Sequence, residues 1–137
     1  MKVVFTTILI AVVVIDQLSK ATSSTITLNT AGPFSIAISN TAATLVATTL
    51  LLAVALAGTT LRQRLHQTQV TGLALIIGGG VTNLTDRLRF GGVRDIGQIA
   101  TLTFNLADVA IALGAFLLVG WALAKREQSQ LSDGQGK

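Results

Sequence analysis

The chain of 137 residues has no cysteine, no tyrosine, one proline and one histidine. Without cysteine it has no thiolate nucleophile, no disulfide framework and no cysteine-based metal site. A single histidine, His66, argues against a histidine-rich metal site and against a Ser-His-Asp triad. We therefore expect chemistry that uses neither a metal ion nor another cofactor.

Charged residues are also scarce, because they make up only 12% of the chain. A soluble domain usually has about a quarter, whereas here half of the residues are hydrophobic. This composition is typical of a membrane protein. The formal charge is +4, but the basic residues are scattered and aromatic residues are only 4%. We interpret the charges as signals of membrane topology and expect no nucleic-acid partner.

Four apolar segments predict an all-α membrane protein with four transmembrane helices. They cover residues 1–15, 41–58, 70–81 and 104–124. The longer runs approach the length that crosses about 30 Å of hydrocarbon, and the third ends in glycines, which allow close helix packing. The first run could also be a secretory signal peptide. However, no small-x-small cleavage pattern directly follows it, and Asp16 and Lys20 continue it at helical spacing.

The remaining segments are polar. Residues 21–40 are rich in serine, threonine and asparagine, and the alternation at residues 25–28 predicts a short strand followed by a loop. Residues 1–124 are expected to form a single domain. Residues 125–137 are rich in glycine, glutamine and serine, and we expect a disordered cytoplasmic tail.

An even number of spans places both termini on one side of the membrane. The basic residues that then share this side are Lys2, Arg62, Arg64, Lys125 and Arg126. The positive-inside rule assigns that side to the cytoplasm. Arg87, Arg89 and Arg94 fall on the outer side and weaken the charge bias. We interpret them as site residues that local aspartates partly balance.

The polar stretch at residues 78–114 contains Asp86, Asp95 and Asp108. Two carboxylates that lie close together in a site of low dielectric cannot both ionise cheaply. One can then activate a water while the other protonates a leaving amine. We expect Asp95 in a loop, and Asp108 in the first turn of the last helix with Asn105 as its N-cap. The chain between them has to fold back to bring the carboxylates together.

Each of these residues also has an ordinary structural interpretation. Asp108 alone is a negative charge of the kind favoured at a helix N-terminus. Asp86 with Arg87 or Arg89 is compatible with an ion pair at the membrane interface. Taken singly, the residues leave both interpretations open.

Five short motifs follow one another along the chain. They are DQLSK at residues 16–20, NTAGPFS at 29–35, GGVTNLTDR at 79–87, GVRD at 92–95 and FNLAD at 104–108. In this order, on a frame of four spans, they resemble the motifs of signal peptidase II, the bacterial lipoprotein signal peptidase family. Each motif alone is weak, and their common order makes the resemblance specific.

The resemblance implies a multi-pass aspartic endopeptidase of the bacterial cytoplasmic (inner) membrane. It also implies a small extracytoplasmic β-platform and an active site on the outer face. Members of the family remove signal peptides from prolipoproteins by cutting immediately before the cysteine that carries a diacylglyceryl group. The implied partners are lipid-modified prolipoproteins and membrane lipids.

Carried over residue by residue, the resemblance makes Asp95 and Asp108 the catalytic pair. Asn83, Arg87 and Asn105 would orient this pair and bind the substrate backbone. The planar donors of the arginine are suited to carbonyl oxygens.

The resemblance also assigns supporting residues outside the pair. Asp16, Lys20 and Asn29 would shape the pocket near the lipid-modified residue. Asp86 would hold Arg87 in place.

The sequence departs from the family pattern at four places. Residues 31–33 replace G-x-A in the second motif, and Arg94 stands where the family usually has an apolar residue. Segments 20–29 and 95–105 are shorter than usual. A compact outer platform could change the substrate range or the rate without removing the pair of aspartates.

Two other classes of function remain alternatives. A small transporter or proton-conducting protein could use intramembrane carboxylates as relays, but it would carry them at mid-span rather than at span ends. A catalytically idle or divergent homologue would fit the eroded second motif and the short loops. Neither expected catalytic aspartate is replaced, which argues against the idle homologue.

Overall fold

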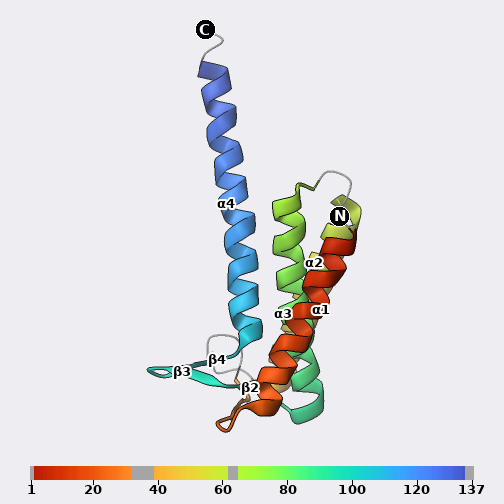
Figure 1. The fold of residues 1–137 in the computed structure, drawn as a ribbon, viewed down its shortest axis with the longest axis vertical. Coiled ribbons are helices and arrows are strands. Elements are labelled where there is room, and N and C mark those ends of the chain that lie inside the picture. The colour runs from red at the N-terminus through yellow and green to blue at the C-terminus, as the bar shows by residue number, and fades with distance from the viewer. Residues whose placement is uncertain (1, 32–38, 62–64, 135–137) are drawn as a thin grey trace.

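Four long helices form the body of the protein (Figure 1). The computed structural model describes residues 2–31, 39–61 and 65–134. The helices are α1 (Lys2–Thr22), α2 (Asn40–Leu61), α3 (Gln67–Phe90) and α4 (Leu106–Gly134). The start of α1 and the end of α4 lie at one end of the bundle, and the strands lie at the other. The predicted four-helix architecture is confirmed.

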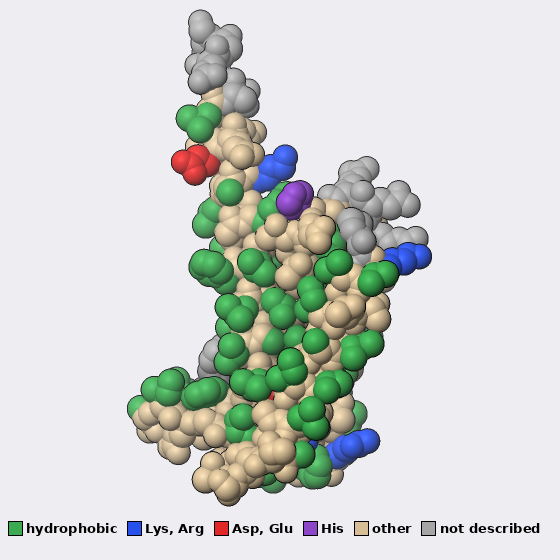
Figure 2. All heavy atoms as spheres, viewed as in Figure 1, with side chains coloured by type: hydrophobic (Ala, Val, Ile, Leu, Met, Phe, Trp, Pro, Cys, Tyr) green, Lys and Arg blue, Asp and Glu red, His purple; other side chains and the backbone are tan. Residues whose placement is uncertain are grey.

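Three of these helices are long and apolar enough to cross a membrane, namely Lys2–Thr22, Asn40–Thr60 and Leu106–Leu131. Large apolar side chains are spread along the sides of the helices (Figure 2). Helix α3 has 24 residues, which gives a length of about 36 Å, but it is more polar than the others. Because α3 contacts each of the other three helices, polar side chains such as Thr82 and Asp86 are buried in protein.

Glycines bring α3 and α4 close together. A Cβ atom on Gly79 would lie 2.6 Å from the carbonyl oxygen of Ala107. A Cβ atom on Gly114 would lie 2.5 Å from the carbonyl oxygen of Gly72. No real side chain fits at such distances, so the helix backbones meet at these positions. The predicted role of the glycines at the end of the third apolar run is confirmed.

A small β-platform lies at the end of the bundle opposite the termini (Figure 1). Its strands are β1 (Thr27–Asn29), β2 (Val93–Asp95), β3 (Gly97–Ile99) and β4 (Leu102–Phe104). Strands β1 and β2 pair antiparallel, as do β3 and β4. The main-chain N–H of Ile96 donates to the carbonyl oxygen of Phe104 at 3.0 Å and extends the hairpin of β3 and β4. Residues 96–104 therefore fold back, as the sequence required.

The third helix is longer than the apolar run predicted. Residues 82–90 contain neither glycine nor proline, so nothing in the sequence stops the helix at residue 81. It ends at Gly91, whose φ of 73° is left-handed and whose N–H donates to the carbonyl oxygen of Arg87 at 3.1 Å. Asp86 and Arg87, which lie beyond the predicted apolar run, belong to the last turns of α3.

The last helix also differs from its prediction at both ends. Phe104 belongs to β4, and α4 begins at Leu106 and continues to Gly134. The sequence predicted a disordered tail from residue 125, but α4 continues to Gly134. Residues 125–133 contain good helix formers and no glycine or proline. The expected loop at residues 32–38 and the arginines at residues 62 and 64 lie outside the described residues.

Candidate active site

Asn105 links the two aspartates of the predicted pair. It is fully buried between β4 and α4. Its side-chain Nδ2 donates to Asp95 Oδ1 at 2.8 Å, and its Oδ1 accepts from the main-chain N–H of Asp108 at 3.0 Å. The Asp108 carboxylate in turn accepts from the main-chain N–H of Asn105 at 3.2 Å. This reciprocal cap starts α4, as predicted, and joins the two aspartates through one residue.

Asp95 lies at the end of β2 and is only 2% exposed. The prediction that it lies in a loop is wrong, because β2 pairs with β1 and places Asp95 opposite Thr27. Its Oδ2 accepts from Asn29 Nδ2 at 3.1 Å and from Thr103 Oγ1 at 2.5 Å. With the contact from Asn105, three donors from three segments hold this carboxylate in place.

Asp108 receives its remaining support from α3. Asn83 Nδ2 donates to Asp108 Oδ1 at 2.8 Å, and Asn83 Oδ1 accepts from Lys20 Nζ at 3.4 Å. Asp108 is half-buried. The negative charges of Asp95 and Asp108 repel each other, and both interact favourably with Arg87. The structure thus brings the predicted pair and its predicted asparagine partners into one network.

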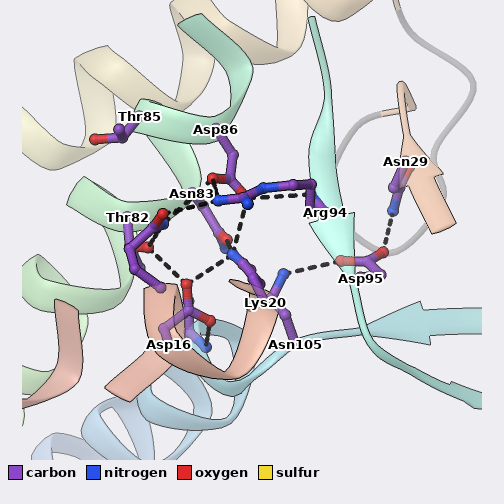
Figure 3. A network of polar contacts seen from close by, with 12 residues as sticks. Asp16, Lys20, Asn29, Thr82, Asn83, Thr85, Asp86, Arg94, Asp95 and Asn105 are labelled. Carbon is purple, nitrogen blue, oxygen red and sulfur yellow. Dashed lines mark hydrogen bonds and ion pairs between the residues drawn. The ribbon is translucent and has the colours of Figure 1, made fainter. Parts of the chain in front are cut away.

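A buried ionic cluster lies beside this network, between α1, α3 and β2 (Figure 3). Lys20 Nζ lies 2.7 Å from Asp16 Oδ2 and 3.0 Å from Asp86 Oδ2, and all three side chains are fully buried. Arg94 Nη2 lies 2.8 Å from Asp86 Oδ1. Buried charges are tolerated only when they are paired and hydrogen-bonded. We call these four residues the ionic quartet.

Asp16 also connects the quartet to the start of α4. Its Oδ1 accepts from the main-chain N–H of Ala107 at 2.9 Å, and its Oδ2 accepts from Thr82 Oγ1 at 2.6 Å. The N–H of Ala107 is one of the helix-terminal groups that lack an intrahelical partner. Asp16 therefore positions the helix that carries Asp108.

Arg87 and Asp86 do not interact in the predicted way. Arg87 donates through Nη1 to Asn40 Oδ1 at 3.0 Å and through Nη2 to the carbonyl oxygen of Ala31 at 2.9 Å. Asp86 pairs with Lys20 and Arg94 instead. The prediction that Asp86 holds Arg87 is wrong, because consecutive helical residues point in different directions.

Three contributors were absent from the predicted site. Thr82 and Gln17 bind the quartet, since Gln17 Nε2 donates to Thr82 Oγ1 at 2.5 Å and to Asp86 Oδ1 at 3.2 Å. Thr103 contacts Asp95. Thr82 precedes Asp86 by one helical turn, and this spacing was the only available signal for it. No sequence signal indicated Thr103, because its contact with Asp95 depends on how residues 96–104 fold back.

No group of three or more acidic or histidine side chains suited to a metal ion occurs in the part of the chain that the structure describes. The side chains that contact Asp95 and Asp108 are amides and one hydroxyl, and the charges of Arg87 and Lys20 lie near them. Such groups can orient a carboxylate pair and bind a peptide backbone.

Comparison with known proteins identifies the family of this chain. The profile described as signal peptidase (SPase) II matches residues 8–124. The lipoprotein signal peptidase of Sphingopyxis alaskensis is 38% identical over 96 residues, which cover 66% of this chain and 55% of that protein. That of Pelotomaculum thermopropionicum is 55% identical over 53 residues, or 38% of this chain and 34% of that protein. The matches thus cover less than two thirds of either relative.

Two solved structures, each described as a bacterial membrane enzyme, share the fold. One has a TM-score of 0.76 and 19% identity, and the match covers 90% of both chains. The other has a TM-score of 0.69 and 20% identity, over 87% of this chain and 92% of that one. At such identities the likeness shows the fold alone, whereas the profile match spans most of the sequence. The chain belongs to the signal peptidase II family.

Proposed function

We propose that this protein is an aspartic endopeptidase that removes signal peptides from diacylglyceryl-modified prolipoproteins, cutting before the lipidated cysteine. Asp95 and Asp108 are its catalytic pair. The observation that carries the proposal is the double contact of Asn105, which binds one carboxylate with its side chain and caps the helix that carries the other. Its relatives are named lipoprotein signal peptidases, which supports this substrate class.

The proposed reaction divides general base and general acid between the two carboxylates. One carboxylate takes a proton from a water whose oxygen attacks the scissile carbonyl carbon. The other, protonated, gives its proton to the amide nitrogen as the C–N bond breaks. Because two neighbouring carboxylates that are both charged repel each other, the proposed reaction starts with one proton shared by the pair.

The surrounding residues act as supports in this proposal. Asn29 and Asn83 orient Asp95 and Asp108, respectively, through the contacts described above. Arg87 donates hydrogen bonds to Ala31 and to Asn40 at the start of α2, and its positive charge offsets the negative charge of the aspartate pair. Asp16 and Lys20 expose no side-chain surface, so they act by positioning other residues rather than by touching the substrate.

We also propose that the protein lies in the bacterial cytoplasmic membrane with both termini in the cytoplasm. Lys2, Lys125 and Arg126 belong to the helix ends that lie away from the strands (Figure 1). The positive-inside rule favours the cytoplasm for that end. The aspartate pair then lies at the outer surface, where a substrate anchored by its own apolar helix and its lipid can approach within the membrane plane.

The test is signal-peptide release from a diacylglyceryl-modified prolipoprotein, followed by gel shift. Asp95→Asn and Asp108→Asn should each abolish release while the protein remains in the membrane. Glu127→Gln is the matched control, because this exposed carboxylate lies on α4 far from the pair. Release by either asparagine variant at the wild-type rate would refute the assignment of the pair. A wild type that cleaves no lipidated substrate would favour an idle homologue.

A further inference from the structure

Arg94 directly precedes Asp95 in β2 and is attached to α3 by Asp86. The main-chain N–H of Arg94 donates to Asp86 Oδ2 at 3.1 Å, and its Nη2 donates to Asp86 Oδ1 at 2.8 Å. Nη2 also donates to Gln17 Oε1 at 2.7 Å. The guanidinium lies 4.3 Å from the centroid of the Phe90 ring. One residue is thus held by a carboxylate, an amide and an aromatic ring.

This attachment matters because it joins β2 to α3 directly beside Asp95. The strand has three residues and, within the described part of the chain, pairs only with the equally short β1. A two-stranded ribbon is at best marginally stable by itself. Asp86, by contrast, is fully buried in a helix that contacts all three other helices. The Asp86 carboxylate therefore holds Arg94, the residue next to Asp95, against the helix bundle.

Arg94 also balances the charge of the ionic quartet. Asp16 and Asp86 supply two negative charges, and Lys20 and Arg94 supply two positive ones. Without Arg94 the cluster would retain one unbalanced buried negative charge. Lys20, which already binds both carboxylates, would then be their only counter-charge, and its weak 3.4 Å contact with Asn83 would compete with both. Because Asn83 binds Asp108, the disturbance would reach the second aspartate of the pair.

We propose that Arg94 is a positioning residue that holds Asp95 in its reactive place through Asp86. This role rests on the proposed peptidase function. Here a short platform is fixed to the bundle by an ion pair and a main-chain hydrogen bond on the same carboxylate.

The experiment compares three variants in the prolipoprotein assay, with rates divided by the amount of folded enzyme in detergent. Arg94→Met removes the charge and donors at similar length, and Arg94→Lys keeps the charge. Arg89→Met is the matched control. Arg89 was interpreted from the sequence as a site residue, but it is exposed near the end of α3 and belongs to none of the ion pairs of the described residues. We expect Arg94→Met to lower kcat about 100-fold with KM nearly unchanged, since small displacements of catalytic groups cost rate.

Arg94→Lys should recover about tenfold of that loss, because one ammonium donor can still reach Asp86 but cannot form the guanidinium fork. Arg89→Met should behave as wild type. A purely structural role would reduce the folded amount and leave kcat per folded enzyme unchanged. A kcat for Arg94→Met within about twofold of wild type would overturn the proposal, because a displaced catalytic carboxylate costs more than that.

Hydrogen exchange supplies a readout that does not depend on activity. The amides of residues 93–95 should exchange faster in Arg94→Met than in wild type and Arg89→Met, because the strand loses the side-chain contacts that attach it to α3 and keeps only the main-chain hydrogen bond to Asp86. Equal exchange in all three proteins would overturn the positioning role. If wild type and Arg89→Met both fail to cleave, the proposed peptidase function fails, and the exchange measurement still decides whether Arg94 fixes the strand.

Discussion

Lys20 is the cation on which the buried part of the site depends, and Lys20→Met tests this dependence. The ammonium lies between Asp16 and Asp86 at 2.7 and 3.0 Å, with no side-chain exposure on any of the three. Methionine has a similar length and fills the same space without the charge. The substitution therefore leaves two buried carboxylates that share only Arg94 as a counter-charge.

The expected loss of stability is large. Removing one partner of a buried ion pair costs about 3–5 kcal/mol, because the remaining charge stays out of water. For a chain of this size, such a loss lowers Tm by roughly 10 °C. The effect should reach the aspartate pair as well, since Lys20 contacts Asn83 and Asp16 binds the first turn of α4.

The measurement is thermal unfolding of the purified protein in one detergent. Lys125→Met is the matched control, because it removes an exposed lysine from α4 and should leave Tm nearly unchanged. The double variant Lys20→Met/Asp16→Asn restores the charge balance and should recover at least about 1 kcal/mol relative to additivity. If Lys20→Met unfolds at the same temperature as Lys125→Met, the quartet does not stabilise the fold and the reasoning is wrong.

Two further predictions concern packing and topology. Gly79→Ala should destabilise the protein by about 1–3 kcal/mol and slow cleavage, since its Cβ would meet the carbonyl oxygen of Ala107 at 2.6 Å. Gly120→Ala, where a Cβ meets nothing within 4 Å, should be neutral in the same unfolding and cleavage assays. In this cysteine-free chain, a cysteine at Gln98 should react with a membrane-impermeant maleimide in intact cells, and one at Glu127 only after lysis. The opposite labelling pattern would refute the proposed orientation.

Much of the fold was readable from local sequence properties. Each long apolar run became a helix, because a bilayer leaves few other ways to satisfy backbone hydrogen bonds. The N-cap at Asn105 also followed from residue type, since it depends on neighbours close in the chain. The order of five short motifs pointed to the family, which the profile match confirmed.

The extension of α3 beyond residue 81 has a physical cause. Polar residues end an apolar run, but they need not end a helix that other helices surround. Helix α3 lies among the other three, so polar side chains such as Thr82 and Asp86 are buried in protein rather than exposed to hydrocarbon. Hydropathy cannot predict this arrangement, because it depends on which helices pack around which.

Composition, local spacing and motif order were enough to predict the four helices, the family and the polar residues available to the site. The tertiary structure alone decided their partners. Asp86 binds Lys20 and Arg94 rather than its neighbour Arg87. These pairings join residues far apart in the chain, or on opposite sides of a turn. They arise only when α1, α3 and β2 pack together and each buried charge must find a partner within a few ångströms.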